Sequence, residues 1–119
     1  MTHTEKDCYR LIQEIAILQD PVCVVCTERK SQAGHHLFTR SRHATAFHPE
    51  AARGLCNICH QEAHEEPQWF RQIMIEEIGD RFFELERLSR TVCKPDYGEV
   101  KKGLVETLNK LKEVNRCFF

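Results

Sequence analysis

A Cys-x-x-Cys pair and two histidines share the stretch Cys56-Asn57-Ile58-Cys59-His60-Gln61-Glu62-Ala63-His64. A second pair with the same spacing, Cys23 and Cys26, lies upstream. Paired turns of this kind are typical of a structural zinc, because the two-residue gap lets both thiolates of each turn converge on one ion at about 2.3 Å. We therefore predict one tetrahedral zinc held by Cys23, Cys26, Cys56 and Cys59.

The remaining cysteines give no sign of a disulfide framework. The chain has seven cysteines, and an odd number without a secretion signal argues against pairing in an oxidising compartment. Cys8, Cys93 and Cys117 have no partner at ligand spacing. We interpret them as ordinary packing or surface thiols.

Composition limits the kind of partner and the place of action. The 119 residues suffice for one domain with a modest core. With 29% charged residues and a formal net charge of -1, the chain as a whole has no positive field, so a DNA-binding surface must be local. No apolar run approaches the roughly 18 residues that span a bilayer, and the polar start lacks signal-peptide character. We expect a single soluble, cytoplasmic domain, residues 1–119, with no membrane partner.

Hydrophobic periodicity predicts an α+β fold with helices at both ends of a metal-binding core. Apolar side chains at helical spacing predict an N-terminal helix over residues 5–20, ended by Asp20-Pro21. The core, residues 21–65, holds both cysteine pairs. There we expect a hairpin strand at Leu37-Phe38, a polar irregular loop from Ser41 to Arg53, and a short helix after Cys59.

The last part of the chain, residues 66–119, is predicted as helices. Pro67 suits the first turn of a helix that ends before Gly79. Asp80 is expected to cap a segment that carries Phe83, Leu85 and Leu88, and Asp96 to begin a terminal helix with a near match to a capping box. The apolar stripe of that helix is expected to be core or the seam of a homodimer, and it consists of Val100, Leu104, Leu108 and Leu111.

The histidines predict a second metal site. Residues four apart share a helix face, so His60 and His64 can bind one ion together. Either His35 or His36 can supply a third ligand, and we expect only one of them to touch the ion, because adjacent strand residues point to opposite sides. The other is then free to act as a general base in phosphodiester hydrolysis. The alternative is that His60 only supports the zinc turn, while His35 and His36 are exposed loop residues.

The order Cys-x-x-Cys, His-His-apolar-apolar-x-Arg, Cys-x-x-Cys-His-x-x-x-His resembles the HNH (ββα-metal) endonucleases, and the histidines look like those of the colicin-type nucleases. The resemblance implies a zinc-stabilised ββα-metal core and DNA cleavage that leaves a 5′-phosphate and a 3′-hydroxyl. It makes His35, His60 and His64 ligands of a catalytic ion and His36 the general base. Five residues before Cys56, where the pattern usually has an asparagine, this chain has Ala51.

A closer likeness is to the NinG, or Rap, recombination nucleases of lambdoid phages, which cut branched DNA. It covers residues 21–112 and rests on Ala33-Gly34-His35, on Phe47, on the second cysteine pair and on the helical tail. It implies a phage- or prophage-encoded enzyme in the bacterial cytoplasm, with branched DNA and recombination proteins as partners. Those nucleases tend to have one histidine after the glycine, so the roles of His35 and His36 can be exchanged.

Basic residues gather near the predicted metal sites, although the chain as a whole is slightly acidic. Recognition of DNA backbone and shape is favoured, since no helix carries Arg, Asn or Gln at repeated base-reading spacing. The residues predicted to contact phosphates are Arg29, Lys30, Arg40, Arg42 and Arg53.

The cofactors implied are a structural Zn²⁺ and a catalytic divalent ion: Mg²⁺, Mn²⁺, Ni²⁺, Co²⁺ or Zn²⁺. An all-histidine site suits the transition metals better than magnesium.

Two other functions stay open. One is an HNH nicking or restriction-like nuclease acting on duplex DNA. The second is a catalytically silent zinc module that only binds DNA or a recombination protein.

Overall fold

The computed structural model describes residues 1–118, with side chains up to Val114. Within that range it has an α+β fold of six α-helices, a short 3₁₀ helix and a two-stranded antiparallel hairpin. The side chain of Cys117 lies outside the described part. None of the helices described is long and apolar enough to cross a membrane.

The first helix, α1 (His3–Gln19), begins two residues earlier than the sequence predicts. Its N-cap is Thr2, whose hydroxyl accepts a hydrogen bond from the Glu5 N–H, while the Glu5 carboxylate accepts one from the Thr2 N–H. This capping box satisfies backbone groups that the first helical turn leaves free. The buried face of α1 has the spacing that predicted the helix, and consists of Cys8, Leu11, Ile12, Ile15 and Ala16.

The hairpin pairs β1 (Ala33–His36) with β2 (Ala52–Leu55) in antiparallel register. The first strand lies on the two histidines, so the prediction of a strand at Leu37-Phe38 is wrong by a few residues. Pairing does continue slightly beyond the strand, because the Leu37 N–H donates to the Ala51 carbonyl. The histidines are therefore held in extended backbone, where consecutive side chains point to opposite sides.

The connection between the strands is more regular than predicted. It contains the short helix α2 (His43–Ala46) and a 3₁₀ turn, Pro49–Ala51. The prediction of an irregular loop from Ser41 to Arg53 is therefore wrong in part. Helix α2 matters for the site, because it places a backbone carbonyl next to β1.

Three consecutive helices, α3 (Asn57–Glu65), α4 (Pro67–Ile78) and α5 (Asp80–Ser89), follow the hairpin. The predicted helix from Pro67 to Ile78 is confirmed, and Gly79 follows it with a φ of 61°, a backbone conformation that favours glycine. Asp80 is the first residue of α5 and makes no side-chain capping bond, which corrects the predicted cap. Of the apolar residues named for this segment, Leu85 is buried while Phe83 and Leu88 are exposed, and Phe82 is buried beside Leu85 in the same core.

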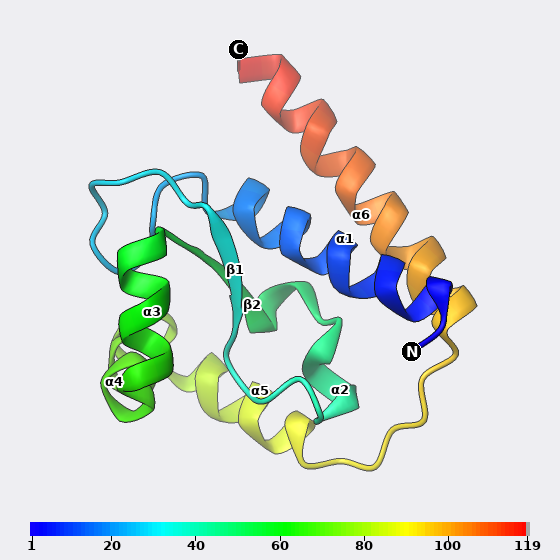
Figure 1. Cartoon of the computed structure of the whole chain (residues 1–119), viewed down its shortest axis with the longest axis horizontal. Coiled ribbons are helices and arrows are strands. Elements are labelled where there is room, and N and C mark those ends of the chain that lie inside the picture. Colours follow the sequence, from blue (N-terminus) through cyan, green and yellow to red (C-terminus); the bar gives the residue numbers. More distant parts are fainter. Residues whose placement is uncertain (119) are drawn as a thin grey trace.

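The hairpin lies between two hydrophobic cores (Figure 1). One core, on the side of α3, α4 and α5, includes Leu55, Phe70, Met74 and Phe82 and the buried cysteines of the two Cys-x-x-Cys pairs. The other lies between α1, α2 and α6 and includes Ala52 of β2. Because residues alternate along a strand, β2 contributes Leu55 to the first core and Ala52 to the second.

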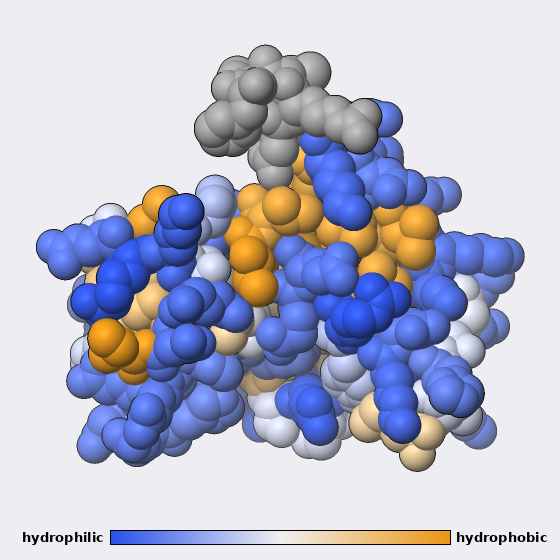
Figure 2. Space-filling model, turned by 45° about the horizontal axis from the view of Figure 1, so that its top comes forward, coloured by the Kyte–Doolittle hydropathy of each residue, from blue (hydrophilic) through white to orange (hydrophobic). Residues whose placement is uncertain are grey.

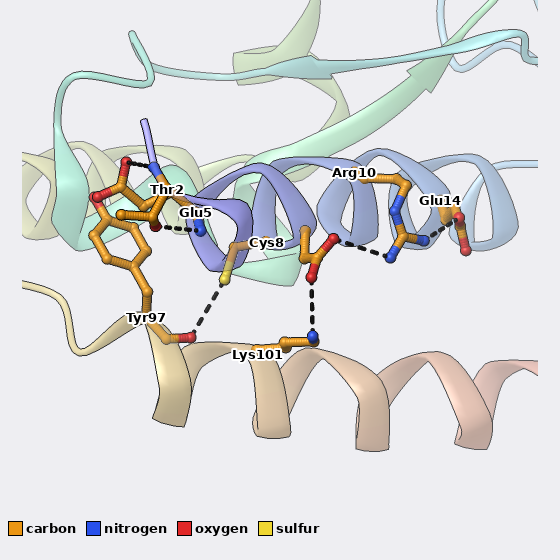
Figure 3. A network of polar contacts seen from close by, with 8 residues as sticks. Thr2, Glu5, Cys8, Arg10, Glu14, Tyr97 and Lys101 are labelled. Atoms are coloured by element: carbon orange, nitrogen blue, oxygen red, sulfur yellow. Dashed lines mark hydrogen bonds and ion pairs between the residues drawn. The ribbon is translucent and has the colours of Figure 1, made fainter.

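The last helix, α6 (Tyr97–Phe118), packs along α1. Figure 3 shows the polar part of this contact: the Cys8 thiol donates to the Tyr97 carbonyl over 3.4 Å, and Lys101 Nζ lies 2.9 Å from an Asp7 carboxylate oxygen. The predicted apolar stripe also faces α1, with Leu104 and Leu108 buried. Of the two alternatives predicted for this stripe, core or dimer seam, the structure shows the core.

The face shown in Figure 2 is mostly hydrophilic, with several hydrophobic patches. Exposed large apolar side chains include Val22, Ile58, Val105 and Val114. Exposed apolar residues of this kind are common on soluble folds.

Candidate metal centres

The four cysteines of the two Cys-x-x-Cys pairs converge on one point. The sulfur atoms of Cys23, Cys26, Cys56 and Cys59 all lie within 4.8 Å of one another. Three of these residues are buried, and Cys26 is half-buried. A compact all-thiolate set of this kind could hold a structural zinc.

Backbone hydrogen bonds shape the first cysteine turn. The Cys23 N–H donates to the Arg29 carbonyl over 2.8 Å, and the Thr27 N–H donates to the Cys23 carbonyl over 2.9 Å. Hydrogen bonds from the N–H groups of Arg29 and Glu28 lower the pKa of the Cys26 thiol. The turn is thus built to stabilise the thiolate, which is the form that binds metal.

The second cysteine turn forms the start of α3. Cys56 is the N-cap of this helix, and its sulfur accepts a hydrogen bond from the Cys59 N–H over 3.4 Å. A helix N-terminus favours a negative charge. Backbone N–H groups therefore stabilise the sulfur atoms at both turns. The first turn lies in a loop, and the second is the N-terminus of α3.

Arg29 supplies a positive charge at the cysteine cluster. Its Nε donates to the Cys56 sulfur over 3.2 Å, and its Nη2 lies 3.7 Å from the Cys59 sulfur. Burial acts to raise the pKa of Cys56, but hydrogen bonds from Arg29 and from the Cys59 N–H outweigh it and lower this pKa to about 6. Arg29, predicted to contact DNA, is therefore engaged at the cysteine cluster, where it would offset the charge of bound thiolates.

A second cluster joins one strand histidine to two helix histidines. One ring nitrogen from each of His35, His60 and His64 lies within 4.8 Å of those of the other two. The Nε2 atoms of His60 and His64, one turn apart on α3, are 3.1 Å apart, and the His35 ring centroid is 4.7 Å from that of His64. A tetrahedral ion with bonds of about 2.0–2.1 Å holds its nitrogen ligands roughly 3.3 Å apart. The triad therefore has a spacing that fits a metal ion.

Its surroundings favour the neutral form of His35 and His60. Burial, together with the neighbouring His64, His60 and His36, lowers the pKa of His35 to about 3. Burial and the nearby His64 also lower the pKa of His60. Phe70 of α4 adds apolar surface, with its ring centroid 4.7 Å from that of His35. Neutral imidazole is the form that binds metal ions, so these two pKa shifts favour metal binding by His35 and His60.

His36 lies apart from the triad, on the side of β1 that faces α2. Its Nε2 lies 2.9 Å from the Ala46 carbonyl oxygen. A carbonyl only accepts hydrogen bonds, so this contact places a proton on Nε2 and leaves Nδ1 as the basic nitrogen. Burial lowers the pKa of His36, so its imidazole is neutral near pH 7. Strand alternation thus separates the two adjacent histidines in the way that the sequence predicts.

All four histidines line one cavity of about 890 Å³. Residues of α1, α3, α4 and α5 complete its wall. The charged residues that line it are four arginines and one glutamate, namely Arg10, Arg40, Arg42, Arg71 and Glu86. This excess of positive charge in the cavity wall favours an anionic ligand.

Of the five basic residues predicted to contact DNA, Arg40 and Arg42 lie at this cavity. The Arg40 guanidinium lies 4.9 Å from the centroid of the Tyr9 ring, and Arg42 Nη1 donates to the Ser89 hydroxyl over 3.1 Å. Arg53 pairs instead with Asp20 over 2.8 Å, and its side chain is only 15% exposed. Lys30 is exposed, next to the first cysteine turn.

Several polar residues of the cavity wall belong to no sequence motif, among them Arg10 and Gln13 of α1 and Arg71 of α4. Arg71 donates to both carboxylate oxygens of Glu86, over 3.1 and 3.2 Å. The periodicity of a helix predicts its buried face, but it does not say which element its polar side chains will meet. No pattern within the sequence could therefore have assigned these residues to the histidine site.

Comparisons with protein-family models, with curated proteins and with solved structures find no match to this chain. The resemblance to the HNH endonucleases remains an expectation from the sequence. The two clusters and the cavity are therefore the basis for inferring a function.

Proposed function

We propose that this protein is a metal-dependent phosphodiester hydrolase that cuts DNA, of the HNH type. The observation that carries the proposal is the arrangement of its four histidines. Three of them cluster as ligands, and His36 lines the same cavity with the proton of its ring held by a backbone carbonyl. A ligand set and a separate base around one cavity are the groups that metal-assisted hydrolysis requires.

His35, His60 and His64 would hold the catalytic ion. Three imidazole nitrogens suit zinc, nickel, cobalt or manganese better than magnesium, which prefers oxygen ligands. When bound, such an ion supplies a Lewis acid that stabilises charge on the phosphate and on the leaving oxygen. The four-cysteine cluster would hold the structural zinc.

His36 would move the proton. Its neutral imidazole, with Nδ1 free of hydrogen, can accept a proton from the water that attacks phosphorus. The contact with the Ala46 carbonyl, 2.9 Å long, fixes the ring and stabilises the cation that forms, because a charged donor makes a stronger hydrogen bond. Helix α2 therefore has a role in the site through its backbone alone.

The arginines of the cavity support a polyanionic substrate. Arg40 and Arg42 follow β1 closely in the chain, and a guanidinium binds phosphate oxygens with a planar pair of N–H donors. Contacts to phosphates position DNA without reading its sequence. The substrate we propose is therefore DNA selected by backbone and shape, with branched DNA as the form that the NinG likeness suggests.

A cleavage assay with added metal tests this proposal. Zinc-loaded protein is freed of other ions and supplied in turn with Mg²⁺, Mn²⁺, Co²⁺, Ni²⁺ or additional Zn²⁺, on linear duplex and on four-way branched DNA of the same sequence. We expect cleavage with at least one transition metal, with 5′-phosphate and 3′-hydroxyl ends. The His64→Ala variant should need far more metal for the same rate, because one of three ligands is gone.

Two outcomes would point elsewhere. If the protein binds both DNAs but cuts neither with any ion, it is a silent zinc module. If it cuts linear and branched DNA equally well, the preference for branched DNA is wrong, and a nuclease of ordinary duplex takes its place.

A further inference from the structure

Gln13 of α1 holds the strand that carries the histidines. Its side-chain Nε2 donates to the Gly34 carbonyl over 2.9 Å, and its Oε1 accepts a hydrogen bond from the Gly34 N–H over 2.8 Å. Both backbone polar groups of one strand residue are thus satisfied by a single amide side chain. Gly34 is the residue directly before His35 and His36.

The same point of the strand lies tightly against the helix. Gly34 is buried, and a Cβ atom added to it would come within 2.9 Å of the Ala16 Cβ and 3.2 Å of the Gln13 Cα. Since real Cβ atoms do not approach that closely, only glycine fits here without a shift of α1 or β1. The close approach keeps the Gln13 amide within reach of the strand backbone.

Gln13 is alone in this role among the residues whose side chains the structure describes. No other side chain in that range hydrogen-bonds to the backbone of Ala33–His36. Just beyond the other end of the strand, the Leu37 N–H donates to the Ala51 carbonyl, which is a contact between two backbone groups and involves no side chain. Gln13 therefore supplies the side-chain hydrogen bonds that fix the backbone of this strand, and it lies outside the cysteine and histidine motifs.

A rotation of β1 at Gly34 would displace both histidines at once, because they leave the strand on opposite sides. His35 would move away from His60 and His64, and His36 would move relative to the Ala46 carbonyl. A misplacement of about 1 Å in a catalytic group can cost roughly 100-fold in rate. Small movements at Gly34 are therefore expected to have large effects on the site.

We propose that Gln13 is the positioning residue of the histidine site, acting through the Gly34 backbone on both His35 and His36. The role in cleavage rests on the function proposed above, whereas the role in metal binding by the triad does not. Gln13→Met tests both, because methionine keeps the volume of the side chain and removes both hydrogen bonds. The matched control is Gln32→Met, at the residue next to β1, where the glutamine Oε1 accepts only from the Asn57 N–H at the start of α3.

The experiment compares zinc-loaded wild type, Gln13→Met and Gln32→Met by nickel titration, by the kcat and KM of DNA cleavage, and by thermal unfolding. We expect Gln13→Met to lose about 10- to 100-fold in both nickel affinity and kcat, with KM for DNA nearly unchanged, as is typical when a supporting residue of a metal site is removed. Gln32→Met should stay within about twofold of wild type in both, a range that a positioned ligand would exceed.

Equal nickel affinity and kcat in the two variants would overturn the proposal. If the wild type cuts no DNA, the proposed function fails, but the nickel titration still decides whether Gln13 positions the triad. If Gln13→Met does not fold, Gln13→Glu replaces it. That variant keeps the oxygen facing the Gly34 N–H and sets a carboxylate against the Gly34 carbonyl. It should lose nickel affinity as well, and wild-type affinity would overturn the proposal.

Discussion

Thr27 has a φ of 58°, in the left-handed region that β-branched residues avoid. It directly follows Cys26, its N–H donates to the Cys23 carbonyl, and its hydroxyl donates to the Cys26 carbonyl. Left-handed backbone costs an L-residue roughly 1–2 kcal/mol. Such strain persists where surrounding interactions fix the backbone, and here the cysteine turn does so.

Replacing Thr27 with Gly should therefore stabilise the protein. We expect the free energy of unfolding to rise by about 1 kcal/mol, because glycine removes the strain and the lost hydroxyl bond is exposed. Denaturant unfolding of the zinc-loaded protein measures this difference. A drop in stability would show that the Thr27 hydroxyl contributes more to the turn than the strain costs.

At the scale of elements, β2 depends on close contact with α1. A Cβ atom on Gly54 would lie 2.5 Å from the Asp20 carbonyl oxygen and 2.8 Å from the Ser31 hydroxyl. Gly54 also donates its N–H to the Asp20 carboxylate, which pairs with Arg53 next to it in the strand. The end of α1 and the hairpin thus fit together only because this position has no side chain.

Two alanine substitutions test that fit. Gly54→Ala should destabilise the fold by about 1–3 kcal/mol, because backbone atoms must move to admit the methyl group. Gly103→Ala on α6, where nothing lies within 4 Å of an added Cβ, should instead stabilise it by about 0.5–1 kcal/mol. Thermal and denaturant unfolding of both variants give the comparison. Equal effects would mean that α1 and β2 are not closely packed.

The elements differ in how far the sequence could predict them. Helices α1 and α4 and the start of α3 follow from periodicity, proline and the cysteine turn, which are local signals. Strand β2 has the sequence Ala52-Arg53-Gly54-Leu55, without a β-branched residue, and α2 is too short to be stable by itself. Both form through tertiary contacts, which a single sequence does not display.

The candidate site shows the same division. The spacing of His60 and His64 on a helix, with strand alternation at His35 and His36, predicted that His60 and His64 meet one of these two strand histidines. The choice of His35 came from the resemblance to the HNH endonucleases. The contacts of Arg29 with the cysteines, of Arg53 with Asp20 and of Gln13 with Gly34 join residues 21 to 33 positions apart. Side-chain contacts over such separations depend on the packing of whole elements, which a sequence does not display. The assignment of Arg29 and Arg53 to a DNA surface therefore rested on the charge pattern alone.

For the whole molecule, the cysteine cluster belongs to the core beside α3, α4 and α5. Three of its cysteines are buried there among Leu55, Phe70 and Phe82. A chain of this length has a modest core, and structural zinc sites commonly supply much of the folding free energy of such domains. The fold should therefore depend on the metal.

Cys56→Ser should leave the protein largely unfolded, whereas Cys93→Ser, at an exposed cysteine outside the cluster, should melt like the wild type. Metal analysis of the wild type should give one tightly bound zinc per chain before any ion is added. Circular dichroism on heating compares the variants. Absence of zinc together with normal melting of Cys56→Ser would contradict a structural metal at this cluster.

The central claim is that His36 is a general base next to a metal held by other histidines, and the cleavage rate of His36→Ala at saturating metal tests it most directly. Loss of a positioned base typically costs about 100- to 10,000-fold in rate. We expect a loss of that size, with nickel and DNA affinities close to those of the wild type. Cleavage at the wild-type rate would contradict the claim. The claim would also be contradicted if His36→Ala lost the ion while His35→Ala retained it. In that case His36 would be the ligand and His35 the base.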